Sequence, residues 1–321
     1  MSFTSIALGI VIAAVTIALL TFAIAVIRTR RIAAEAERMV PPSGKFIDID
    51  GNRIHYVEKG AGRPILFIHG LGAQLHQFRS TLFDKIEGYR LIAIDRPGSG
   101  YSERVAGATG GLSEQALVVR HFIEALRLER PLVVGHSLGG AVALTLAVEH
   151  PQCLSGLALL SPYTHHTGAI APEFAALYIP SPLKRRLIAE TVAVPATQKH
   201  AQETLAFVFG PQSAPANYMT EGGGWLGLRP SHFYATSTDI VAIGNDYPRV
   251  QQKFGEIELP VGILFGTADR VLDYQKHGVE MVGRIPDLDL ELAEGVGHMP
   301  QFSTTVQTAA FVKRMAERVS S

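Results

Sequence analysis

Residues 131–147 have the sequence PLVVGHSLGGAVALTLA, in which a serine stands between glycines where the pattern changes. Residues 131–134 form a short apolar run, as expected for a strand buried on both faces of a sheet. Residues 140–147 are mostly small and predict a helix. A sharp strand-to-helix turn needs glycines, because a Cβ there would collide with the neighbouring backbone. The pattern therefore predicts that Ser137 is a nucleophile lifted out of the sheet beside a helix N-terminus.

From residue 45 onward, apolar strands alternate with helical patterns. A hairpin is expected around Asp50-Gly51-Asn52, and helices are expected at 75–86, at 112–128 and at the C-terminus. With the strand before Ser137, the sequence contains eight predicted strands, the others lying at residues 46–50, 53–57, 64–68, 90–94, 154–160, 260–265 and 288–292. This alternation predicts an α/β fold with a mostly parallel sheet covered by helices on both faces.

Two segments depart from this rhythm. Between residue 162 and about 255 the chain is rich in proline, aromatic residues and short helical patterns, which predicts a helical cap over the carboxyl edge of the sheet. A proline-rich stretch at residues 41–44 indicates the start of the globular part. The sequence predicts four parts, which are a transmembrane anchor at 1–28, a linker at 29–44, a core at 45–162 and 256–321, and a cap at 163–255. The linker is expected to include a short polar helix at 32–39.

The N-terminal segment has no charged residue between Ser2 and Ile27. A bilayer core of about 30 Å requires about 20 helical residues, so this segment is long enough to span it. Arg28, Arg30 and Arg31 follow directly, and the positive-inside tendency places that flank, with the rest of the chain, in the cytoplasm. The alternative is a signal peptide that is cleaved on export. It is disfavoured because no Lys or Arg precedes the apolar run, which also exceeds the usual 7–15 residues.

Composition excludes several other classes of protein. The formal net charge is zero, which gives no support to nucleic-acid binding. Cys153 is the only cysteine, so an intrachain disulfide is impossible. No His, Cys or carboxylate spacing predicts a metal site, and no glycine-rich motif predicts a dinucleotide. We therefore expect no cofactor, and the sequence makes no prediction of oligomeric state.

The partners that Ser137 requires lie downstream. A serine hydroxyl is a weak nucleophile near neutral pH and needs a base, and histidine is the side chain suited to that task. His298 lies between a glycine and Met-Pro just past the last predicted strand, and Asp269 follows the strand before it. We expect Asp269 to orient His298 and to stabilise its charged form. Asp273 is the alternative acid, although it also fits a helix N-cap.

Several motifs together carry a resemblance to a known family. They are His69-Gly70, residues 95–100 (DRPGSG), the turn at Ser137, residues 266–270 (GTADR) and residues 297–300 (GHMP). From about residue 45 to the C-terminus the chain resembles the α/β-hydrolase superfamily, whose triad has this Ser…Asp…His order. The resemblance implies an oxyanion hole formed by the backbone N–H groups of Leu71 and Leu138. It also implies that Asp95 belongs to a structural turn.

The kind of hydrolase is expected from the same residues. Haloalkane dehalogenases and epoxide hydrolases of this superfamily carry Asp where this chain has Ser137, which forms an acyl-enzyme instead. The GHSLGG motif resembles esterases and lipases, and the N-terminal anchor resembles that of membrane-bound monoacylglycerol lipases. We therefore expect a serine hydrolase of small-molecule carboxylic esters with an apolar acyl or alcohol part. The alternatives are a carbon–carbon bond hydrolase of the meta-cleavage product type, an amidase or aminopeptidase, and a non-catalytic scaffold.

Overall fold

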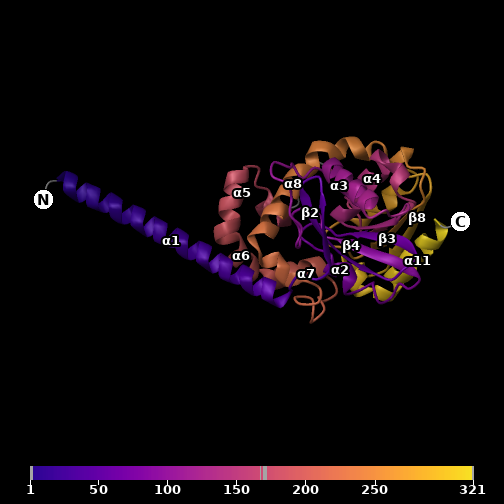
Figure 1. Cartoon of the computed structure of the whole chain (residues 1–321), viewed down its shortest axis with the longest axis horizontal. Helices are drawn as coiled ribbons and strands as arrows, with labels where there is room; N and C mark the ends of the chain where they lie inside the picture. Colours follow the sequence, from indigo (N-terminus) through magenta and orange to yellow (C-terminus); the bar gives the residue numbers. More distant parts are fainter. Residues whose placement is uncertain (1–2, 167, 169–171, 320–321) are drawn as a thin grey trace.

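The computed structural model describes residues 3–166, 168 and 172–319, so the first two residues of the predicted anchor lie outside the described part. A long helix, α1, projects from one end of a body in which helices surround a central sheet (Figure 1). The strands are β1 (Lys45–Ile49), β2 (Asn52–Lys59), β3 (Arg63–Ile68), β4 (Tyr89–Ile94), β5 (Leu132–His136), β6 (Gly156–Leu160), β7 (Val261–Gly266) and β8 (Leu288–Ala293). All eight predicted strands are confirmed.

The sheet has the order β1-β2-β4-β3-β5-β6-β7-β8. β1 and β2 pair antiparallel, as do β2 and β4, and the remaining neighbours are parallel. The carboxyl ends of β3 to β8 therefore meet at one edge, which is where ligands bind in sheets of this kind. The fold is the mostly parallel eight-stranded α/β architecture that the sequence predicts.

Helices form the other regular elements of the fold. They are α1 (Phe3–Met39), α2 (His76–Arg79), α3 (Leu112–Ala125), α4 (Leu138–Glu149), α5 (Pro182–Ile188), α6 (Val194–Lys199), α7 (Ala201–Phe209), α8 (Pro230–Gln251), α9 (Tyr274–His277), α10 (Pro300–Ser303) and α11 (Thr305–Arg318). A π-helical turn, Ala189–Ala193, joins α5 to α6. The segment between β6 and β7 contains α5 to α8, which agrees with the helical character predicted for the cap.

The helix expected over residues 75–86 is much shorter than predicted. Only α2, four residues long, is helical, and turns follow it. The hydroxyls of Ser80 and Thr81 donate hydrogen bonds to the carbonyl oxygens of His76 and Gln77, at 2.7 and 2.6 Å. Such side chains compete for the backbone groups that a continuing helix would use.

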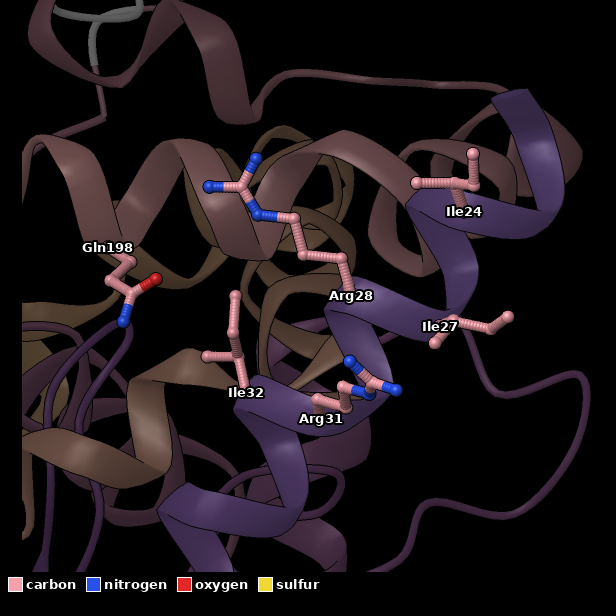
Figure 2. A pocket seen from close by; sticks show the side chains of 6 residues that line it. All are labelled: Ile24, Ile27, Arg28, Arg31, Ile32 and Gln198. Carbon is pink, nitrogen blue, oxygen red and sulfur yellow. The ribbon is translucent and has the colours of Figure 1, made fainter. Parts of the chain in front are cut away.

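Helix α1 is continuous from Phe3 to Met39, so the predicted separate helix at 32–39 is instead the end of α1. The reason is that good helix formers fill this stretch and no proline occurs before Pro41. Residues 3–24 are exposed, and the helix is long and apolar enough to cross a membrane. Its last third packs on the cap, where Ala36 contacts the apolar residues of α6 and of the Gly224–Leu228 turn. A cavity of about 380 Å³ lies between α1 and α6 (Figure 2).

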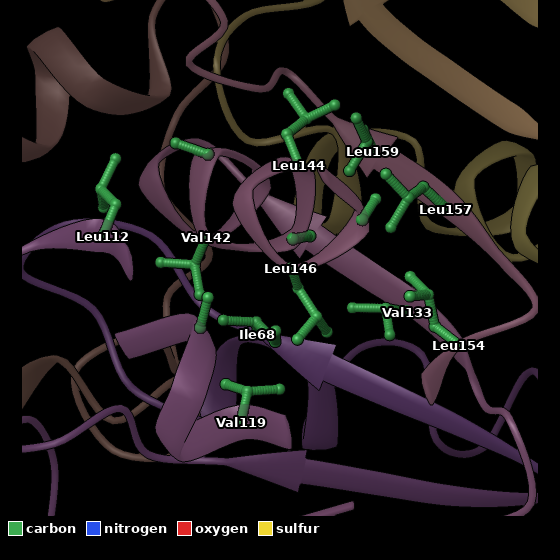
Figure 3. Close-up of a cluster of buried hydrophobic side chains, with 14 of the residues drawn as sticks. Ile68, Leu112, Val119, Val133, Val142, Leu144, Leu146, Leu154, Leu157 and Leu159 are labelled. Carbon is green, nitrogen blue, oxygen red and sulfur yellow. The ribbon is translucent and has the colours of Figure 1, made fainter. Parts of the chain in front are cut away.

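The hydrophobic core lies on both faces of the sheet. Helices α3, α4 and α8 pack on one face, and the α2 region and α11 pack on the other. All residues of α4 from Leu138 to Ala147 are buried. Figure 3 shows Val142 and Leu146 of α4 beside Ile68 and Val133 of the sheet. A helix that is apolar around its whole circumference is stable only when it is enclosed in this way. Burial therefore fixes the position of the N-terminal turn of α4 on the sheet.

Candidate active site

Ser137 lies in a strained turn between β5 and α4. Its backbone angles are φ 51° and ψ −118°, a conformation that non-glycine residues rarely adopt. The turn fits only because Gly139 has no Cβ; one added there would overlap the carbonyl oxygens of Ile68 and His69. The carbonyl oxygen of Ser137 accepts a hydrogen bond from the N–H of Tyr163 at 3.0 Å. Strain that the surroundings hold in place is typical of functional positions, so the geometry agrees with a functional role for Ser137.

His298 and Asp269 form a buried pair at the same edge of the sheet. His298 Nδ1 lies 2.7 Å from Asp269 Oδ2, and both side chains are almost fully buried. Asp269 Oδ1 accepts hydrogen bonds from the N–H groups of Val271 and Leu272, at 2.8 and 3.0 Å. Burial alone would raise the pKa of Asp269, but the charge and hydrogen bond of His298 and these two amides lower it below its ordinary value. A carboxylate accepts the hydrogen on Nδ1, which leaves Nε2 free to accept a proton.

The alternative acid, Asp273, has a different role. Its Oδ1 accepts a hydrogen bond from the N–H of Gln275 at 2.9 Å, and it stands at the N-cap of α9. This is the helix-capping position that its sequence context also allows. The structure therefore pairs Asp269, not Asp273, with His298.

His136 connects the serine turn to the His298 loop. Its Nε2 donates a hydrogen bond to the carbonyl oxygen of His298 at 2.9 Å, and the two imidazole rings lie 4.9 Å apart. Ser137 follows His136 directly, so the structure brings all three predicted triad residues to one place. Among the described residues, no hydrogen bond joins Ser137 Oγ to His298. In related enzymes such bonds are often long before the substrate binds.

The two predicted oxyanion donors face the same turn. Leu138 is the first residue of α4, and Leu71 follows Gly70 in the loop after β3. Neither N–H group donates a hydrogen bond within the described part of the chain. A Cβ added to Gly70 would lie 3.1 Å from Ser137 Cβ, so the loop and the serine turn are in contact. Two unpaired N–H groups beside a serine are the kind of donors that an oxyanion hole requires.

Arg96 supports this loop, and sequence reasoning missed it. Its fully buried guanidinium donates hydrogen bonds to the carbonyl oxygens of His69 and Gly70, at 3.0 and 2.9 Å. Nη1 of Arg96 also binds Asp239 of α8 at 2.6 Å, and Asp239 binds Arg104 as well. The available signal was a cation two residues after the end of the apolar strand β4. Its partner Asp239 lies 143 positions away, and no periodicity connects the two residues.

Asp95, the neighbour of Arg96, is structural, as the resemblance implied. Its carboxylate lies 2.7 Å from Nδ1 of His55 and accepts hydrogen bonds from the N–H groups of Leu75 and Tyr101, both at 2.8 Å. It is almost fully buried. These three contacts connect the loop after β4 to β2 and to the segment before α2, which is a structural role.

Four other histidines are neutral near pH 7. Burial lowers the pKa of His69 and His136 to about 3, and that of His232 and His277 to about 4. We call these four residues the buried histidine set. Within the described ranges, no three or more His, Cys, Asp or Glu side chains are grouped so as to hold a metal ion. Unlike the four members of the buried histidine set, His298 has a carboxylate as its direct hydrogen-bond partner.

A family model described as the alpha/beta hydrolase fold matches residues 63–305. The chain belongs to the α/β-hydrolase family. This α/β hydrolase is 26% identical over 272 residues to a 2-hydroxy-6-oxo-6-phenylhexa-2,4-dienoate hydrolase of Burkholderia cepacia, covering 81% of this chain and 91% of that protein. Family and fold identify the chain as a hydrolase.

Two further comparisons are informative. The α/β hydrolase is 42% identical over 120 residues to the dihydrolipoyllysine-residue acetyltransferase component of an acetoin cleaving system from Cupriavidus necator; this covers 37% of the chain and only 32% of that relative. A crystal structure of a membrane phospholipase A superposes with a TM-score of 0.66 at 23% identity, covering 99% of both chains. At that identity the likeness shows the fold.

Proposed function

We propose that this α/β hydrolase cleaves carboxylic esters with an apolar acyl or alcohol part, and that Ser137, His298 and Asp269 are its catalytic triad. The observation that carries the proposal is the buried pair of His298 and Asp269, 2.7 Å apart, behind a serine held at a positive φ. The unpaired N–H groups of Leu71 and Leu138 supply the oxyanion hole.

Each group has one task in the proposed reaction. Ser137 Oγ attacks the ester carbonyl while His298 Nε2 takes its proton, and Asp269 stabilises the imidazolium that forms. The carbonyl oxygen becomes an oxyanion bound by the two backbone N–H groups. The carbon–oxygen bond to the alcohol breaks, and the alcohol leaves with the proton from His298. Water then repeats the sequence on the acyl-enzyme, releasing the carboxylic acid and restoring Ser137.

We further propose that α1 anchors the enzyme in a membrane, with the globular part on the cytoplasmic side. The exposed apolar length of α1 and the arginines at positions 28, 30 and 31 support this orientation. Export after signal cleavage is the competing possibility. A size shift of the mature chain, measured by intact mass, would support export, whereas an intact N-terminus in carbonate-washed membranes supports the anchor.

The first test of the ester proposal is a chain-length series. Full-length enzyme in detergent micelles is assayed with p-nitrophenyl esters from acetate to palmitate, beside the Ser137→Ala variant. We expect Ser137-dependent hydrolysis that is greatest at medium or long acyl chains. Activity that is unchanged in Ser137→Ala, or confined to acetate, contradicts the proposal. Labelling by a fluorophosphonate probe, which requires only an activated serine, checks the nucleophile independently of the substrate.

A carbon–carbon bond hydrolase is the second candidate, favoured by one comparison. The Burkholderia cepacia relative, whose name specifies 2-hydroxy-6-oxo-6-phenylhexa-2,4-dienoate as substrate, matches most of both chains. The same triad would serve that reaction. The loss of absorbance of that compound, measured beside the ester series, separates the two functions. Turnover of the dienoate with negligible ester hydrolysis would replace the ester proposal.

A further inference from the structure

The depth of the cap relative to a membrane is set by the single helix α1. The apolar run of α1 ends at Arg28, and from Phe3 to Arg28 a helix rises about 38 Å, enough to cross a hydrocarbon core of about 30 Å. The next residue, Thr29, is buried and donates a hydrogen bond from Oγ1 to the carbonyl oxygen of Thr191 in the cap, at 2.8 Å. Because α1 has no break, the cap segment around Thr191 must lie at the membrane boundary once α1 is inserted.

The cap exposes large apolar side chains around this contact. Leu183 is 80% exposed, Leu187 is 52% exposed and Val192, adjacent to Thr191, is 58% exposed. The two leucines are four residues apart on α5 and therefore share one face of the helix. Figure 1 shows α5 and α6 at the end of the body from which the free part of α1 projects. Exposed apolar residues gathered next to a membrane-spanning helix are typical of a surface that enters the lipid interface.

The charges around these residues are mostly positive. Lys184 and Arg186 are exposed beside the α5 leucines. Arg28 and Arg31 line the cavity between α1 and α6 together with Ile24, Ile27, Ile32 and Gln198 (Figure 2). Neither arginine forms an ion pair or hydrogen bond within the described part of the chain. The nearby carboxylate, Glu190, already lies 3.9 Å from Arg30.

We propose that this face of the cap docks on the surface of an anionic phospholipid bilayer. The cap docking surface consists of Leu183, Leu187 and Val192, which enter the acyl–headgroup boundary, and Arg28 and Arg31, which bind lipid phosphates. The cavity then holds a headgroup against two guanidinium groups, with isoleucines beside its first acyl carbons. The proposal rests on the membrane insertion of α1 and is independent of which bond the enzyme cleaves.

The test measures how close each position lies to lipid. Full-length protein carrying Cys153→Ser is labelled with an NBD fluorophore at Leu183→Cys and reconstituted into phosphatidylcholine vesicles containing phosphatidylglycerol and doxyl-labelled lipid. Ile17→Cys in α1 reports insertion of the anchor. Leu292→Cys on β8 is the matched control, since it is an exposed leucine on the last strand of the sheet, far from the projecting part of α1 (Figure 1). Quenching by doxyl lipid is compared at the three positions.

We expect doxyl lipid to quench the labels at positions 17 and 183 by about twofold or more and to leave the label at 292 unchanged. Quenching at 183 should decrease when phosphatidylglycerol is omitted, and Arg28→Gln with Arg31→Gln should remove that dependence on lipid charge. Quenching at 17 but not at 183 overturns the docking while leaving the anchor intact. No quenching at 17 overturns both. Fluorescence at 183 that follows protein density and ignores doxyl lipid shows a second copy on this face and also overturns the proposal.

Discussion

Replacing Asp269 with asparagine is expected to abolish most of the activity while leaving the fold intact. Asp269 Oδ1 accepts two backbone N–H groups, so the oxygen of an asparagine amide must take that position. The amide nitrogen is then forced into the place of Oδ2, 2.7 Å from His298 Nδ1, and donates a hydrogen to it. His298 must carry its own hydrogen on Nε2 instead, where it can no longer accept the proton of Ser137. Loss of the correct tautomer in such triads lowers kcat by about 10⁴-fold, or about 5.5 kcal/mol.

The assay compares kcat for the best p-nitrophenyl ester in the wild type, Asp269→Asn and Asp273→Asn. Asp273 provides the matched control, because it has the same side chain four residues away but only caps α9. We expect Asp273→Asn to retain kcat within about twofold, since asparagine caps a helix N-terminus about as well as aspartate and its Oδ1 can accept the same N–H. Melting temperatures establish that each variant is folded. Asp269→Asn with more than a tenth of wild-type kcat, or an equal loss in Asp273→Asn, would refute the assignment of the acid.

Three further predictions concern the support of the site. Gly139→Ala should unfold the serine turn and abolish activity, because its Cβ meets backbone oxygens, whereas Gly227→Ala, which has open space around it, should behave as wild type in expression and activity. Asp239→Asn removes the charge that compensates Arg96 and should destabilise the fold by about 3–5 kcal/mol, seen as a melting temperature lower by about 6 °C or more; an unchanged melting temperature would contradict the buried ion pair. The buried histidine set has pKa values of about 3 to 4 when folded against about 6.5 when unfolded, so the unfolded chain binds more protons below pH 6.5. Stability should therefore be greatest above pH 6.5 and fall as pH decreases toward 4, by up to about 1.4 kcal/mol per pH unit for each histidine, and a melting temperature that is flat from pH 7 to 5 would exclude this effect.

Much of the fold was predictable because its signals are local. Strands β3 to β7 each contain a continuous apolar run, as expected for parallel strands that are buried on both faces. The serine turn was recognisable because Gly135 and Gly139 are required by close backbone approach at fixed spacing. Pairing of Asp269 with His298 followed from their positions after successive strands, whose carboxyl ends meet at one edge.

What sequence reasoning missed is decided by contacts between distant segments. The packing of the last third of α1 on the cap depends on where Ala36 finds apolar partners, which lie in segments distant in the sequence. The role of Arg96 depends on Asp239, and a charged residue in a helix is ordinarily expected to face solvent. The short α2 reflects competition by two hydroxyls that helix periodicity does not register.

The ion pair between Arg96 and Asp239 also has a consequence for how a substrate reaches Ser137. Asp239 belongs to α8, and Arg96 is bound to the loop that carries Leu71. The ion pair therefore holds α8 and that loop together. Moving α8 outward would leave Arg96 buried without its partner, at a cost of about 3–5 kcal/mol, which would slow entry by about 10²- to 10⁴-fold. We therefore expect the substrate entrance to open by motion of the shorter helices α6 and α7 while α8 keeps its position.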